Sequence, residues 1–140
     1  IETSVLGNDR LVCSLPGEVR PSGTFYTYAA KYMDDSTRLF IPADLPAEIT
    51  KQIRRLAIQA CRAVDCAGMA RVDFLIEPSD YIIYISEINT IPGFTQISMY
   101  PKLWEASGLP YAALIDRLVE LALERKAEQD RTERRFGRNE

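Results

Sequence analysis

The spacing of hydrophobic positions changes several times along the chain, and each change predicts a different element. Apolar and polar residues alternate in IETSVL and RLVCSL, on either side of Gly7-Asn8-Asp9, which predicts a β-hairpin over residues 1–15. Residues 44–64 carry apolar side chains at helical spacing and predict an amphipathic helix. The buried face predicted for this helix consists of Ile49, Ile53, Leu56, Ala57, Ala60 and Val64.

A second hairpin and a last helix follow. ARVDFLI (70–76) and YIIYISEI (81–88) are rich in β-branched and aromatic residues and flank the turn EPSD, so we expect two antiparallel strands. A loop is predicted from Thr90 to Pro101, and a helix from about Pro110. The buried face predicted for that helix consists of Tyr111, Leu114, Leu118, Leu121 and Ala122.

Charge then sets a domain boundary. From Glu124 nearly every residue is charged or polar, so residues 127–140 are predicted to be a disordered tail and residues 1–126 the folded region. A chain of 140 residues is long enough for one domain with a hydrophobic core. Together the predicted elements indicate an α+β fold, an antiparallel sheet flanked by helices.

Composition excludes several classes of function. The net charge of −3 gives no general attraction to nucleic acid or an anionic membrane, and no apolar run reaches the roughly 20 residues of a membrane span. Cys13, Cys61 and Cys66 are an odd count without a Cys-x-x-Cys motif, so we expect buried free thiols in a cytoplasmic protein, ahead of a metal site or a disulfide. Histidine is absent, so any metal must be a hard cation on oxygen ligands. Because Ile1 stands inside a predicted strand, we expect a C-terminal piece of a longer protein.

Polar side chains interrupt the second hairpin. Side chains of a strand alternate between its faces, so Arg71, Asp73 and Leu75 share one face. One face of the partner strand is predicted to carry Ile83, Ile85, Glu87 and Asn89. A tight turn near Ser79 would put Arg71 opposite Glu87, with Asp73 on the diagonal.

These groups suit a metal site better than a plain sheet surface. An Arg71–Glu87 ion pair on a solvated face is the alternative, but Asp and Asn are depleted in strands, so it explains Asp73 and Asn89 poorly. Two close carboxylates repel unless a cation lies between them. Oxygen ligands at this spacing suit Mg²⁺ or Mn²⁺, whose coordination a nucleotide phosphate would complete.

The same hairpin resembles the C-terminal signature of D-alanine–D-alanine ligases, which belong to the ATP-grasp superfamily. The signature is ARVDFLIEPSDYIIYISEINTIPGF (70–94), with its Arg-x-Asp and Glu-x-Asn-Thr-x-Pro-Gly motifs. FYTYAAKY (25–32) resembles the mobile loop of that family, and SMYPKLWEASGLPY (98–111) resembles its continuation. The resemblance extends to about residue 126 and implies the C-terminal half of an ATP-grasp domain.

The resemblance implies a reaction in two steps. ATP phosphorylates the carboxylate of one D-alanine, and the amine of a second D-alanine attacks the acyl phosphate to form D-alanyl-D-alanine for peptidoglycan. By the pattern of the family, Asp73, Glu87 and Asn89 would bind two Mg²⁺ (or Mn²⁺) ions. Arg71 and the backbone N–H of Gly93 would stabilise the transition state.

The resemblance also implies binding roles. Ser98 and the backbone beside Met99 would hold the carboxylate of the second D-alanine. Lys31 would reach a phosphate, and Tyr32 would close the loop over the site. The residues expected to line the adenine slot are Phe25 and Leu75. Departures from the family pattern occur at Thr27 and Ala29, where acidic residues are common; loop dynamics could differ.

The resemblance implies that this chain needs the N-terminal part of the same enzyme as its partner. That part would supply the first D-alanine site, lysines and the ribose-binding acid, so the 140 residues alone are expected to be inactive. A homodimer stays open. Two alternatives also stay open: a ligase that uses D-lactate or D-serine, and a non-catalytic ATP-grasp binding module. The pair Lys31-Tyr32 favours dipeptide formation, and the intact Arg71 and its polar neighbours favour catalysis.

Overall fold

The computed structural model describes residues 1–20, 38–95 and 97–131. Its strands are β1 (Glu2–Gly7), β2 (Val12–Cys13), β3 (Glu18–Arg20), β4 (Arg38–Phe40), β5 (Gly68–Ile76) and β6 (Ile83–Asn89). Its helices are α2 (Ala47–Ala63), α3 (Met99–Ala106) and α4 (Tyr111–Arg131). The predictions made for Phe25, Lys31 and Tyr32 lie outside the described residues.

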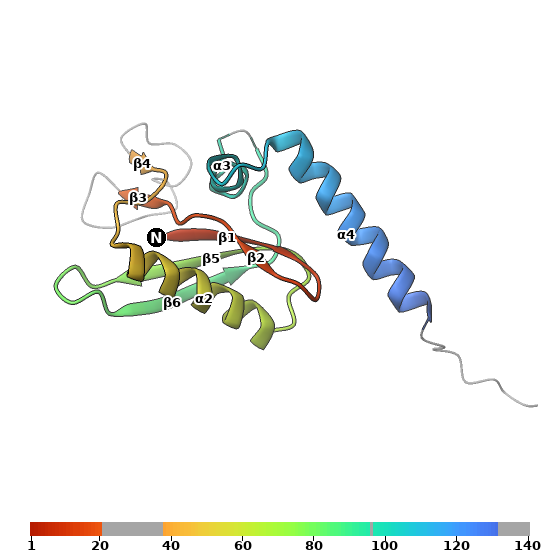
Figure 1. Ribbon diagram of the computed structural model, residues 1–140, viewed down its shortest axis with the longest axis horizontal. Helices are drawn as coiled ribbons and strands as arrows, with labels where there is room; N and C mark the ends of the chain where they lie inside the picture. The colour runs from red at the N-terminus through yellow and green to blue at the C-terminus, as the bar shows by residue number, and fades with distance from the viewer. Residues whose placement is uncertain (21–37, 96, 132–140) are drawn as a thin grey trace, which may run out of the picture.

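An antiparallel sheet of four strands, in the order β2-β1-β5-β6, organises the described part of the chain (Figure 1). Both predicted hairpins are confirmed, since β1 pairs with β2 and β5 pairs with β6. β1 joins the two hairpins by pairing with β5, from Glu2 opposite Asp73 to Gly7 opposite Gly68. β3 and β4 form a separate two-stranded sheet. The predicted α+β class is confirmed.

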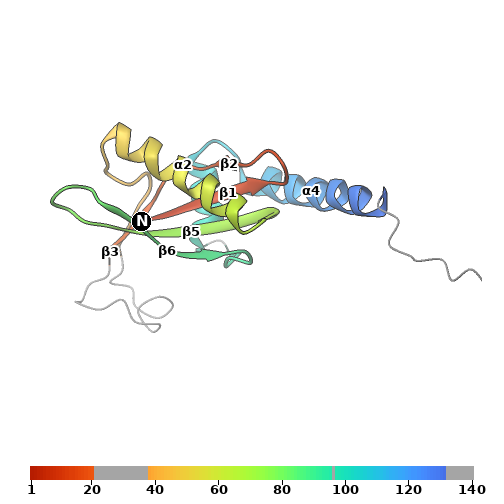
Figure 2. The same ribbon diagram turned by 90° about the horizontal axis from the view of Figure 1, so that it is seen from below.

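Helix α2 covers one face of the sheet, as the view in Figure 2 shows. Its apolar side chains pack with β1, β2 and β5 in a core cluster of Val5, Cys13, Ile53, Ala57, Cys61, Ala70, Val72 and Phe74. The helical spacing of apolar residues therefore predicts the helix correctly. Val64 is the exception, because it follows the last helical residue and is 57% exposed.

Helices α3 and α4 cover part of the opposite face of the sheet. Leu6 packs there in a second cluster with Tyr100, Trp104, Leu114 and Leu121. The Tyr100 hydroxyl donates to Val5 O at 3.0 Å. The sequence predicts a loop over residues 90–101 and therefore misses α3. Pro101 lies in the first turn of α3, where proline disturbs no helical hydrogen bond.

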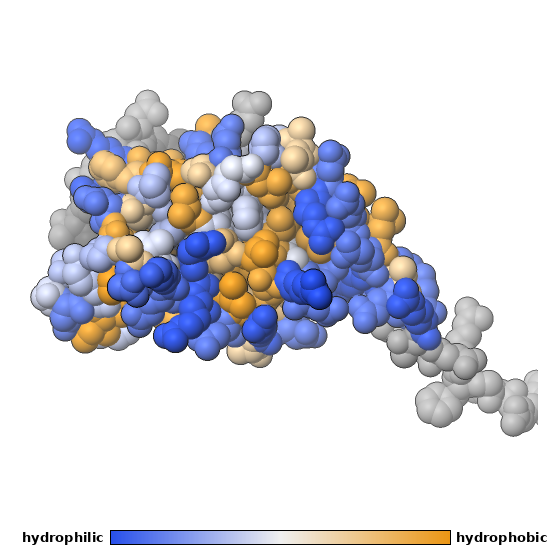
Figure 3. All heavy atoms as spheres, viewed as in Figure 1, coloured by the Kyte–Doolittle hydropathy of each residue, from blue (hydrophilic) through white to orange (hydrophobic). Residues whose placement is uncertain are grey.

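Helix α4 is longer than predicted. It continues to Arg131, so the predicted tail boundary after residue 126 is wrong for residues 127–131, while residues 132–140 are outside the described part. Ion pairs one helical turn apart, such as Lys126–Asp130, favour helix in this charged segment. Of its predicted buried face, Tyr111 and Ala122 are exposed instead. Hydrophilic residues cover most of α4 on the face shown in Figure 3.

A long-range hydrogen bond and the state of the cysteines complete the description of the fold. The Asn8 side chain, in the β1–β2 turn, donates to Leu121 O at 2.9 Å and ties that turn to α4. The three cysteines are free thiols, with Cys13 and Cys61 buried. None of the described helices is long and apolar enough to cross a membrane.

Candidate active site

Three strands place their polar side chains on the face of the sheet that α2 does not cover. In one cross-strand row Asp73 lies between Glu2 of β1 and Glu87 of β6. In the next row Arg71 lies between Ser4 and Asn89. The predicted convergence of the two carboxylates with Arg71 and Asn89 is thus present, and Glu2 joins it.

The predicted register of the hairpin is wrong by two residues. Arg71 lies opposite Asn89 rather than Glu87, and Asp73 lies directly opposite Glu87 rather than on a diagonal. A β-bulge causes one residue of the difference, because Asp73 pairs with Glu87 whereas Phe74 already pairs with Ile85. The other residue comes from the turn, since Ile76 pairs with Ile83 rather than with Ile82. The extra residue, Ser86, cannot be recognised from alternation alone.

The bulge also changes which side chains of β6 face the core. Ile83 and Ile88 both pack against the α2-side cluster, although residues five apart in a regular strand point to opposite faces. Ile85, predicted to share the face of Glu87, instead lies opposite the core residue Phe74. The bulge therefore sends isoleucines to one face of the sheet and Glu87 to the other.

Arg71 is the buried centre of the site. Its side chain is 9% exposed, and its Nε and Nη2 atoms donate to the two oxygens of Asp73 at 2.7 and 2.6 Å. Nε also lies 3.1 Å from Glu2 Oε2, and Nη2 lies 3.6 Å from Glu87 Oε1. Burial alone lowers the pKa of Arg71, but the bond to Asp73 and the surrounding carboxylates raise it above its ordinary value. The guanidinium therefore stays charged.

The donor set of this row fits a hard divalent cation. Glu2, Asp73 and Glu87 carry three negative charges against the single positive charge of Arg71, so a divalent cation would balance the cluster. All of the donors are oxygens, and the Glu87 side chain is 54% exposed and accessible. Within the described residues no three or more His, Cys, Asp or Glu side chains are already arranged to coordinate a metal ion. This agrees with the hydrogen bond from Arg71 to Asp73, which occupies an oxygen that a metal would need.

Gly93 and Ser98 come together at the start of α3. A Cβ added at Gly93 would lie 3.1 Å from Ser98 Oγ. That oxygen accepts from the Thr95 backbone N–H at 3.0 Å, and Ser98 stands at the N-cap of α3 with extended backbone. The Met99 side chain is buried against Gly17, so only its backbone is available to a ligand. A helix N-terminus of this kind offers N–H groups to a carboxylate.

An apolar strip borders the polar rows. Leu75 lies opposite Tyr84, on the same face as Asp73, and the two side chains are 66% and 57% exposed. Such exposure of large apolar residues beside a polar site is typical of a surface that a ligand covers. The adenine-lining role of Leu75 stays a prediction, and its predicted companion Phe25 is outside the described residues.

Sequence reasoning missed Glu2. Its carboxylate is buried and reaches Arg71 only because β1 pairs with β5. The available signal was a lone carboxylate inside the predicted strand IETSVL, where a solvent-facing position was an equally good explanation.

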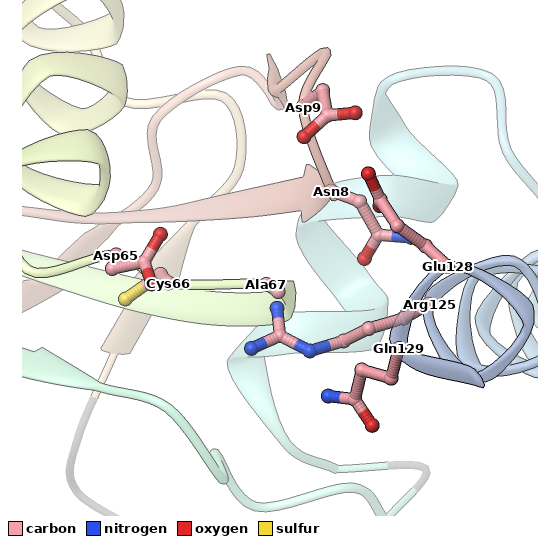
Figure 4. A pocket seen from close by; sticks show the side chains of 8 residues that line it. All are labelled: Asn8, Asp9, Asp65, Cys66, Ala67, Arg125, Glu128 and Gln129. Carbon is pink, nitrogen blue, oxygen red and sulfur yellow. The ribbon is translucent and has the colours of Figure 1, made fainter. Parts of the chain in front are cut away.

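A separate cavity of about 330 Å³ lies between the β1–β2 turn, the segment before β5 and the end of α4 (Figure 4). Its lining residues are Asn8, Asp9, Asp65, Cys66, Ala67, Arg125, Glu128 and Gln129. None of these residues belongs to the predicted site, so the cavity is separate from the row of carboxylates around Arg71.

The comparisons with known proteins agree with one another. A family model described as D-ala D-ala ligase C-terminus matches residues 1–120. A D-alanine–D-alanine ligase of Solibacter usitatus is 55% identical over 138 residues, which are 99% of this chain and 42% of that protein. The chain therefore spans less than half the length of this relative.

Solved structures give the same picture. The D-alanine–D-alanine ligase of Coxiella burnetii matches with a TM-score of 0.79 and 48% identity, over 93% of this chain and 33% of that one. The VanG D-Ala:D-Ser ligase of Enterococcus faecalis matches with a TM-score of 0.75 and 37% identity, over 86% of this chain and 35% of that one.

Proposed function

The chain belongs to the D-alanine–D-alanine ligase C-terminal family, and from that premise we propose that it forms the metal-binding and transition-state-binding part of an ATP-dependent ligase. The ligase would join two D-alanines for peptidoglycan synthesis in the cytoplasm. The observation that carries the proposal is the row of Glu2, Asp73 and Glu87 around the buried Arg71. Because the chain spans 42% of its relative, the first D-alanine site would come from the remainder of the enzyme.

The residues in and around the row would have different roles in phosphoryl transfer. Asp73, Glu87 and Asn89 would hold two Mg²⁺ (or Mn²⁺) ions, which would neutralise negative charge on the nucleotide phosphates. Arg71 is fixed by Asp73 on rigid backbone, so it would stabilise developing negative charge without rearranging. Lys31 would add a point charge at a phosphate. Leu75, exposed beside the row, would pack on the adenine with Phe25.

The loop before α3 would hold the second substrate. Ser98 Oγ and the backbone N–H of Met99 lie at the N-terminus of α3, which favours a carboxylate. Gly93 lies close to Ser98, since an added Cβ would stand 3.1 Å from Ser98 Oγ, so the Gly93 N–H and this carboxylate site would serve one bound intermediate. This arrangement would place the amine of the second D-alanine near the acyl phosphate.

The identity of the second substrate is a separate question. The likeness to a D-Ala:D-Ser ligase means that the fold of this half is compatible with another acceptor. We propose D-alanine, because the chain is 55% identical to a D-alanine–D-alanine ligase and carries the pair Lys31-Tyr32. The Tyr32 hydroxyl would keep the closed loop in the form that selects D-alanine.

The experiment uses the full-length enzyme and weighs its products by mass. With ATP and Mg²⁺, wild type should form D-alanyl-D-alanine, and Asp73→Asn and Glu87→Gln should abolish this turnover while the fold is kept. Glu120→Gln is the matched control, because it removes an ion-paired carboxylate on α4, away from the row. Normal turnover by Glu87→Gln at limiting Mg²⁺ would contradict the metal assignment.

A competition among D-alanine, D-serine and D-lactate tests the acceptor. Wild type should incorporate mainly D-alanine at neutral pH, and Tyr32→Phe should admit D-lactate, most of all at lower pH where less amine is uncharged. A wild-type enzyme that prefers D-serine or D-lactate would overturn the choice of acceptor and leave the ligase chemistry in place.

A further inference from the structure

We propose that Glu2 is a positioning residue that holds Arg71 by its Nε side, so that Asp73 can turn its oxygens to a divalent cation. This inference rests on the proposed metal site of the ligase. The observation behind it is that Arg71 and the cation would compete for one carboxylate. Both oxygens of Asp73 are engaged by Arg71, at 2.7 and 2.6 Å.

Burial makes this competition costly. The Arg71 side chain is 9% exposed, and a buried cation that loses its partner is strongly destabilised. If Asp73 turned toward a metal ion with no other carboxylate at hand, Arg71 would be left without a counter-charge. Glu2 would supply that counter-charge, because its Oε2 lies 3.1 Å from Arg71 Nε and it is carried by β1, a different strand from Asp73.

Exposure separates the roles of the three carboxylates in the row. The side chains of Glu2, Asp73 and Glu87 are 8%, 15% and 54% exposed. Access thus increases from β1 to β6, so a ligand from solvent meets Glu87 and then Asp73. Glu2 lies on the far side of Asp73 and is a partner of Arg71 rather than a metal ligand.

The strand pairing fixes this order. Glu2 is directly opposite Asp73, so both carboxylates flank the side chain of Arg71 from neighbouring strands. A group that hydrogen-bonds a metal ligand commonly changes metal affinity by about 10- to 100-fold when it is replaced. Arg71 is such a group for Asp73, and Glu2 acts one contact further out, through Arg71, so the lower end of that range is expected.

The test measures Mn²⁺ binding to the full-length enzyme in the presence of ATP, by the electron paramagnetic resonance signal of free Mn²⁺. Glu2→Gln keeps the size of the side chain but removes its charge, so Arg71 should hold Asp73 more firmly. We expect Mn²⁺ to bind about tenfold more weakly to this variant. Glu120→Gln, which removes an ion-paired carboxylate on α4, should bind Mn²⁺ like wild type.

A double-mutant cycle shows whether Glu2 acts through Arg71. Arg71→Gln removes the competitor for Asp73, so in this background Glu2→Gln should no longer change Mn²⁺ affinity. Glu2→Asp keeps the charge at shorter reach and should restore part of the lost affinity, which also provides a second variant if Glu2→Gln folds poorly. Thermal unfolding of each variant separates weak binding from a loss of folded protein.

The outcomes distinguish this inference from the proposed function. Unchanged Mn²⁺ affinity in Glu2→Gln, in an enzyme that still makes D-alanyl-D-alanine, would overturn the role of Glu2 alone. An equal loss of affinity with and without Arg71 would also overturn it, since Glu2 would then act independently. If wild type makes no dipeptide but the cycle behaves as expected, the proposed reaction fails and the positioning role stands.

Discussion

Replacement of Arg71 by lysine would keep the positive charge and remove its planar geometry. The guanidinium donates two hydrogen bonds to Asp73 at 2.7 and 2.6 Å and also contacts Glu2 at 3.1 Å. A lysine ammonium is a point charge and cannot reproduce that fork in a site where the side chain is 9% exposed. Arg71→Lys should therefore lose about one charge-assisted hydrogen bond in the transition state.

The size of the effect follows from that one bond. A hydrogen bond to a charged group is worth about 1.5–3 kcal/mol, which corresponds to a rate loss of roughly 10- to 150-fold. Because Arg71 is proposed to act on developing charge, kcat should fall by this factor while the KM for ATP changes little.

Steady-state kinetics with ATP as the varied substrate measures both constants, and thermal unfolding shows whether the variant is folded. A variant in which only the KM for ATP rises would refute the reasoning, because Arg71 would then bind the ground state. A variant with full kcat would show that charge alone suffices at this position.

Three further predictions concern the loop, the core and pH. Gly93→Ala should raise the KM for the second D-alanine, because the new Cβ would lie 3.1 Å from Ser98 Oγ; an unchanged KM would separate Gly93 from the substrate. Tyr100→Phe should lower the free energy of unfolding by about 1–2 kcal/mol in urea denaturation, because Val5 O loses its buried donor; an unchanged value would show that another group satisfies it. Burial raises the pKa of Cys61 to about 12 from an ordinary 9.0, so the free energy of unfolding should be unaffected by this thiol below pH 9.0 and fall as pH rises toward 12. In urea denaturation at alkaline pH, the free energy of unfolding of Cys61→Ala should depend less on pH than that of wild type. An equal pH dependence in the two proteins would exclude the thiol as its source.

Local patterns predicted most of the elements. The two hairpins and α2 could be predicted because they depend on local signals. Alternating apolar and polar residues, turn residues and helical spacing can each be recognised within a short segment. Helix α3 could not, since its eight residues include Pro101 and follow a Pro-Gly turn, both of which indicate a loop. The length of α4 was underestimated because charged residues were read as a tail, although they pair along the helix.

The candidate site was predicted in its members but not in its geometry. Arg71, Asp73, Glu87 and Asn89 do converge, because face alternation survives an error of two residues in register. Glu2 could not be assigned, since its role depends on a strand pairing between distant parts of the chain.

The extra residue at Ser86 separates two kinds of constraint along a single strand. Ile83 before it and Ile88 after it both pack beside α2, while Glu87, the residue next to Ser86, faces the site. Deleting Ser86 would restore strict alternation and force an exchange, in which either Glu87 is driven among apolar side chains or the isoleucines enter the site. One residue without a cross-strand partner thus lets β6 supply core side chains and site carboxylates within a single short strand.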